Sequence, residues 1–148
     1  MSAENRIKEL GIELPSIPKA GGNYVHARRS GNTVYLSGKV PKNTFGKLGD
    51  TVSIEEGYAA AREVGMYQLS VLRDLLGSLD KVTGVIKVFG MVNATPDFGQ
   101  QPAVINGCSD LFVEVFGEKG RHARSAVGMG SLPRQVCVEI EAIVEVEE

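Results

Sequence analysis

Apolar residues recur at near-helical spacing over the segment 54–79, and this is the clearest pattern in the chain. Ser53 stands just before it and Glu56 follows three residues later, which is the spacing of a capping box. In that motif the serine and glutamate side chains each accept a hydrogen bond from a backbone amide at the start of a helix. Gly77 supplies a stop signal. The pattern therefore predicts a long amphipathic helix that begins after Ser53.

Two other segments also have helical character. Residues 3–11 predict a short helix, which a glycine and two following prolines end. Apolar residues at helical spacing between 104 and 116 predict a second amphipathic helix. Pro102 marks its start, and Gly117 closes it.

Strand patterns surround these helices. A glycine pair at 21–22 precedes a predicted strand over 24–28, and the tight turn 30–32 leads into a second strand over 33–40. Residues 82–92 are β-rich and nearly continuously apolar, as expected of a strand covered on both faces. Residues 136–146 alternate between two faces. One face carries Val136, Val138, Ile140, Ala142, Val144 and Val146, and the other carries Cys137, Glu139, Glu141, Ile143 and Glu145.

The order of elements is ββαβαββ, in which a short strand around residue 124 precedes the strand over 136–146. Two helices on one face of a mixed β-sheet predict an α+β fold, a sandwich of two layers. The second face of the sheet must then meet water or another subunit. Because that face mixes polar and apolar residues, we expect a homo-oligomer.

Composition and charge narrow the class of protein. The 148 residues fit one domain, and 43% hydrophobic with 23% charged residues is ordinary for a globular protein. A net charge of −2 gives no electrostatic argument for nucleic acid or for an anionic membrane. The two cysteines and two histidines have no metal-like spacing. The two cysteines do not indicate a disulfide framework. We expect a cytoplasmic protein with no metal site.

The stretch 121–141 carries the strongest candidate chemistry. It sets Arg124 on a short β run, and after a tight turn the next strand presents Glu139 and Glu141. A guanidinium suits a small carboxylate substrate, and a glutamate across a hairpin from it could position a water or move a proton. The alternative is a plain surface salt bridge. Cys108 is expected in the core, and Cys137 on the Glu139 side.

Four segments in order carry a resemblance to a known family. They are Asn23-Tyr24-Val25, the SGQxP-like Ser37-Gly38-Lys39-Val40-Pro41, Asn106, and the ending that runs from Ala123-Arg124-Ser125 through Leu132-Pro133 to Val138-Glu139-Ile140-Glu141. From about Tyr24 to Val144 the chain resembles the YjgF/YER057c/UK114 family, also called the Rid (reactive intermediate deaminase) family. Residues 1–148 are then one Rid-like domain with an N-terminal extension over 1–20.

The resemblance implies a chorismate-mutase-like fold, a homotrimer with clefts between subunits, and no cofactor. It implies hydrolysis of small enamine or imine intermediates to a 2-keto acid and ammonia. In that mechanism Arg124 pairs with the substrate carboxylate, backbone groups near Ala126 hold the imine nitrogen, and a water near Glu139 attacks the imine carbon. Tyr24, Ser37 and Gly38 line the cleft, and Asn106 helps to shape it.

Each of these lining residues also has a structural interpretation. Gly38 is compatible with a simple bulge, Tyr24 with an ordinary strand end, and Asn106 with a locally satisfied buried group. Glu141 shares the face of Glu139, which we favour as the water-positioning group. Arg121 and His122 are compatible with a solvated loop.

The sequence departs from the family pattern near the arginine. Ala126 stands where the deaminase type commonly has a cysteine, and Gly128 where an acidic residue is often seen. The N-terminal extension and the longer loop near 98–102 are typical of a larger-bodied subgroup. The alternative function is a non-catalytic trimer that binds small keto acids. A ribonuclease is disfavoured by the acidic charge and the lack of a basic aromatic stripe. The sequence does not identify the physiological substrate or the upstream enzyme.

Overall fold

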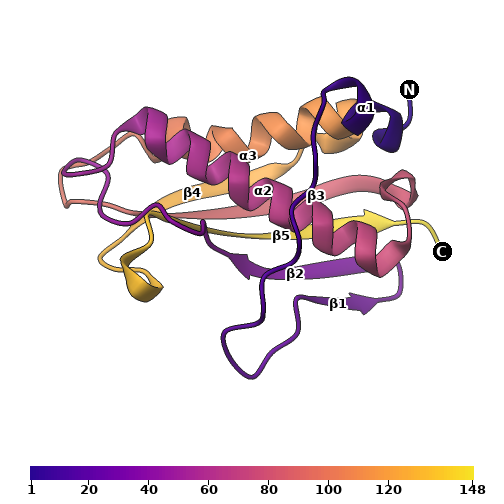
Figure 1. The fold of residues 1–148 in the computed structure, drawn as a ribbon, viewed down its shortest axis with the longest axis horizontal. Coiled ribbons are helices and arrows are strands. Elements are labelled where there is room, and N and C mark those ends of the chain that lie inside the picture. The colour runs from indigo at the N-terminus through magenta and orange to yellow at the C-terminus, as the bar shows by residue number, and fades with distance from the viewer.

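The computed structural model describes residues 1–148 and confirms the predicted order of elements, with one helix in front of it (Figure 1). The helices and strands follow one another along the chain as α1 (Ala3–Glu9), β1 (Ala27–Ser30), β2 (Thr33–Lys39), α2 (Ile54–Leu76), β3 (Val82–Asn93), α3 (Gln101–Phe116), β4 (Ala123–Met129) and β5 (Val138–Val146). Short 3₁₀ turns follow α2, α3 and β4 at Leu79–Lys81, Gly117–Gly120 and Pro133–Gln135. None of the helices is both long and apolar enough to cross a membrane.

The predicted helix signals are present in α2. The Ser53 side chain accepts a hydrogen bond from the Glu56 amide, and the Glu56 carboxylate accepts one from the Ser53 amide, so the capping box is complete. At the other end Gly77 has a φ of 83°, a left-handed conformation that glycine adopts without steric cost. The chain therefore fixes both ends of its longest helix locally.

The sheet has the strand order β1-β2-β5-β3-β4. Only β3 and β4 run parallel, and every other neighbouring pair is antiparallel. The predicted tight turn joins β1 to β2, where Ser30 faces Thr33. The prediction of a strand over 24–28 is wrong for residues 24–26, because β1 begins at Ala27. Tyr24 lies in a local turn, where its amide donates to the Gly22 carbonyl.

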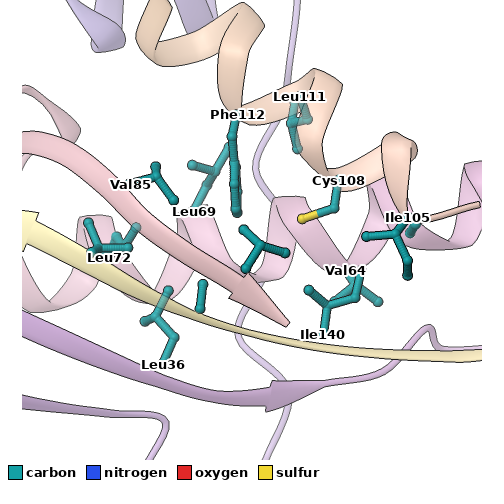
Figure 2. Close-up of a cluster of buried hydrophobic side chains, with 14 of the residues drawn as sticks. Leu36, Val64, Leu69, Leu72, Val85, Ile105, Cys108, Leu111, Phe112 and Ile140 are labelled. Atoms are coloured by element: carbon teal, nitrogen blue, oxygen red, sulfur yellow. The ribbon is translucent and has the colours of Figure 1, made fainter. Parts of the chain in front are cut away.

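Helices α2 and α3 lie side by side over one face of the sheet (Figure 1). Figure 2 shows the core between the two layers, where leucine, valine and phenylalanine side chains of the helices meet those of the strands. The prediction that the strand over 82–92 is covered on both faces is wrong within this chain. Val85, Val88 and Val92 are buried under the helices, whereas Phe89 and Met91 remain partly exposed on the other face.

The face without helices has the mixed character that the C-terminal strand predicted. Strand β5 buries alternate residues against the helices and presents Glu139, Glu141, Ile143 and Glu145 on the other side. Cys137 is an exception, because it precedes β5 and is buried in the core, so the prediction that places it with Glu139 is wrong. We call this second side the open face. Its apolar residues, all partly or largely exposed, include Tyr35, Phe89, Met91, Val127 and Ile143.

A glycine sets how closely α3 approaches α2. A Cβ atom added at Gly107 would overlap the Tyr58 carbonyl oxygen of α2, and backbone atoms at this contact cannot rotate away. We predict that Gly107→Ala lowers the free energy of unfolding by about 1–3 kcal/mol, although alanine has a helix propensity about 1 kcal/mol better than glycine.

Urea unfolding measures this change. Gly99→Ala is the matched control, since no atom lies within 4 Å of its added methyl group. A Gly107→Ala protein as stable as the control would show that the two helices pack less closely than the structure indicates.

Candidate functional site

Arg124 lies on β4 and extends toward α3. Its Nη1 donates to the Asn106 Oδ1 at 2.8 Å and to the Ser109 Oγ at 3.1 Å. No carboxylate of the chain forms an ion pair with it, so the alternative of a surface salt bridge is wrong. Its Nε and Nη2 make no hydrogen bond within the chain. Two donors of a half-buried guanidinium thus form an unused edge, the geometry that binds a carboxylate with two parallel hydrogen bonds.

A chain of hydrogen bonds behind Arg124 holds it in place. The Ser109 Oγ lies 2.8 Å from the His122 Nε2, and the His122 Nδ1 lies 2.6 Å from the Gly120 carbonyl oxygen. A carbonyl only accepts, so Nδ1 carries the proton and Nε2 accepts from Ser109. Burial lowers the pKa of His122. The nearby charge of Arg124 lowers it further, whereas the hydrogen bond to Gly120 opposes the shift. The imidazole therefore stays neutral, as this arrangement requires.

Glu139 lies in a different cavity, of about 710 Å³, which it shares with Tyr24, Ser37 and Gly38. Burial and the charge of Glu141 raise the pKa of Glu139, while Lys39 opposes the shift. A Cβ atom at Gly38 would collide with the Glu139 carboxylate, so the glycine permits a close approach of carboxylate to backbone. A carboxyl group with a raised pKa is suited to proton transfer near neutral pH.

Tyr24 and Ser37 differ in how free they are to bind a ligand. Tyr24 is 48% exposed, and its hydroxyl accepts a hydrogen bond from the Gly21 amide. Its ring meets His26 edge-on, with the ring centroids 6.4 Å apart. The Ser37 hydroxyl donates to the Val25 carbonyl at 2.6 Å and so holds the segment before β1 against β2. The tyrosine ring is therefore open to a ligand, whereas the serine hydroxyl is already used.

The prediction that Glu139 lies across a hairpin from Arg124 is wrong. Strand β3 lies between β4 and β5, and it runs parallel to β4. Arg124 pairs with the buried Val88 and faces the helices, whereas Glu139 pairs with Met91 on the open face. The chain therefore presents two separate groups of candidate residues. Asn106 and Ala126 belong with Arg124, since Ala126 is two residues further along the same side of β4.

Three residues for which the sequence indicated no function belong to these groups, and the interpretation of His122 as a solvated loop residue is wrong. Ser109 and His122 support Arg124, and their connection depends on the 3₁₀ turn at 117–120, which no pattern in the sequence predicts. Lys39 is almost fully buried beside the Glu139 cavity. The SGQxP-like segment contains it, but a lysine in a strand usually indicates a solvated position.

Comparison with known proteins gives evidence that is independent of this geometry. A family model described as "YjgF/chorismate mutase-like, putative endoribonuclease" matches residues 4–144. The chain is 43% identical to the protein TCP17 of Trypanosoma cruzi, over 94% of this chain and 91% of that protein. It is 32% identical to a 2-iminobutanoate/2-iminopropanoate deaminase of Dermatophagoides farinae, over 92% of this chain and 95% of that protein.

A solved structure agrees closely with this fold. The protein Atu1372 of Agrobacterium tumefaciens, whose function is unknown, superposes with a TM-score of 0.90 at 42% identity, over 98% of this chain and 92% of that one.

The neutral state of His122 predicts a dependence of stability on pH. Folding lowers its pKa from an ordinary 6.5, so below that pH the unfolded chain binds a proton that the folded protein does not. The free energy of unfolding should therefore fall as the pH drops from about 8 to about 5.5, and it should fall less in His122→Asn, which has no imidazole. Urea unfolding at the two pH values measures the difference, and equal losses in the two proteins would contradict the assignment.

Proposed function

This chain belongs to the YjgF/chorismate mutase-like family, also called the Rid family, and on that basis we propose that it hydrolyses small enamine and imine intermediates to 2-keto acids and ammonia. The observation that carries the proposal is the unused Nε–Nη2 edge of Arg124. An amino-acid-derived imine has a carboxylate beside the reacting carbon. A guanidinium already held by Asn106 and Ser109 binds it at little entropic cost.

We propose that the complete site lies between two copies of the chain, in a homotrimer. Within one copy, Arg124 and Glu139 occupy separate cavities on opposite sides of the sheet. Strand β4 is at the edge of the sheet, so one side of its backbone has no strand partner within the chain. The apolar residues of the open face, among them Tyr35 and Val127, are suited to burial against another subunit. Packing of this kind would bring the Arg124 of one copy to the Glu139 of its neighbour.

The proposed reaction needs little from the protein beyond orientation. Arg124 binds the carboxylate, and backbone groups near Ala126 hold the imine nitrogen, since the alanine side chain has no donor. Glu139 accepts a proton from a water, whose oxygen bonds to the imine carbon. Glu139 passes this proton to the nitrogen, and the new hydroxyl group gives up a second one to it, so the C–N bond breaks and ammonia leaves as the C=O bond forms. Water is the only co-substrate, and Glu139 returns to its starting state.

The second candidate is a trimer that binds small keto acids without turning over imines. The observation that favours it is the combination of Ala126 and Gly128, which leaves this part of β4 without a polar side chain. In both candidates Arg124 binds the carboxylate of the ligand. They differ in whether the protein accelerates imine decay.

Arg124→Ala tests whether Arg124 binds the substrate carboxylate. We predict that the natural protein accelerates hydrolysis of 2-iminopropanoate and 2-iminobutanoate generated in situ, and that the variant loses on the order of 100-fold in kcat/KM, because a charge-assisted pair with the substrate is lost. Arg121→Ala is the matched control, since this exposed arginine lines the same cavity and bonds neither Asn106 nor Ser109. No acceleration by the natural protein would support the keto-acid binder instead.

Glu139→Gln and Glu141→Gln separate the two carboxylates. We predict that Glu139→Gln lowers kcat by about 10²-fold or more, because the water loses its base. In the natural protein the rate should fall as the pH drops through the raised pKa of Glu139, and this limb should be absent in Glu139→Gln. Glu141→Gln should keep the activity and move the limb to lower pH, since a neighbouring negative charge is removed. The reverse pattern would make Glu141 the base.

A further inference from the structure

Lys39, at the end of β2, is the most unusual charged residue of the chain. It is only 4% exposed, yet it lines the cavity that contains Glu139. Its Nζ donates to the Ser37 carbonyl at 3.0 Å, and no carboxylate lies within ion-pair distance of it. A buried ammonium without an ion pair is costly, and the cost falls when the amine gives up its proton.

The surroundings of Lys39 favour the neutral amine at a moderate pH. Burial lowers the pKa of Lys39 to about 8, although the negative charge of Glu139 opposes the shift. An ordinary lysine has a pKa of about 10.4, so near pH 8 the neutral fraction of Lys39 exceeds that of an exposed lysine by roughly 100-fold. A desolvated, partly neutral lysine is the form that attacks carbonyl groups.

The same cavity suits an anionic carbonyl compound. The other charged side chains that line it are Lys19, Lys42, Arg134 and Glu139, so positive charges outnumber negative ones. Its volume of about 710 Å³ is ample for a small organic acid. A carboxylate at the basic rim would leave the neighbouring carbonyl carbon free to point toward the buried amine.

We propose that Lys39 is a covalent binding site for small 2-oxo acids, which it holds reversibly as a Schiff base beside Glu139. The neutral Nζ attacks the ketone carbon and forms a carbinolamine. The Glu139 carboxylate takes up a proton released by the nitrogen and returns it to the departing hydroxyl group, so water is lost and a C=N bond to the lysine remains. Nothing is oxidised or reduced, and addition of water reverses the step. The inference does not require imine hydrolysis, since the oxo acid alone is the ligand.

Reductive trapping tests this inference directly. The natural protein is incubated near pH 8 with pyruvate and sodium cyanoborohydride, which converts a Schiff base into a stable secondary amine, and peptide mass mapping then locates the adduct. We expect Lys39 to be labelled at least 10-fold faster than any other lysine, and Lys39→Gln to lose this label. Preferential labelling of exposed lysines, or labelling of Lys39 no faster than theirs, would overturn the proposal.

Two controls separate the reactivity of Lys39 from the general effect of removing a lysine and from the folding of the Lys39→Gln variant. Lys8 is exposed on α1 and lies outside this cavity, so Lys8→Gln should leave the labelling of Lys39 unchanged. The decisive comparison among lysines is made within the natural protein, so it does not depend on how well Lys39→Gln folds. Imine hydrolysis without a Lys39 adduct would overturn this inference alone. An adduct without hydrolysis would overturn only the deaminase proposal.

Discussion

The alternation of side chains across the sheet is the constraint on which the rest of this structure depends. Successive residues of a strand point to opposite faces, and here one face is closed by two helices. The alternation sends Arg124 toward α3 and Glu139 toward the open face. Because β3 separates their strands, no movement of a side chain within one copy brings the two together. A site that uses both residues requires a second copy of the chain.

Each group of residues is arranged before a ligand binds. Asn106 and Ser109 hold one nitrogen of Arg124, and the neutral His122 completes the support. On the other side, Gly38 lets the Glu139 carboxylate approach the backbone, and burial raises the pKa of that carboxyl group. Orientation of this kind supplies much of what hydrolysis of an already electrophilic imine needs. Lys39 adds a buried amine to the cavity that contains Glu139. The positioning of a water by Glu139 does not require this amine.

The fold was predictable because its signals are local. The capping box at Ser53, the stop at Gly77 and the alternation of 138–146 each depend on residues close in sequence. The site was only partly predictable, because its contacts join distant residues. The sequence pattern indicated Arg124, and the family resemblance indicated Asn106. The pattern placed Glu139 on a neighbouring strand, since nothing local reveals that β3 lies between. The support from His122 depends on an irregular turn with no sequence signature.

Mixing of two inactive variants tests most directly whether the site is shared between subunits. Arg124→Ala and Glu139→Gln chains are unfolded separately, refolded together, and assayed for imine hydrolysis. If each cleft takes Arg124 from one subunit and Glu139 from the next, random assembly into trimers restores roughly a quarter of the clefts, and with them that share of the natural activity. Activity no greater than that of the separately refolded variants would contradict a shared cleft.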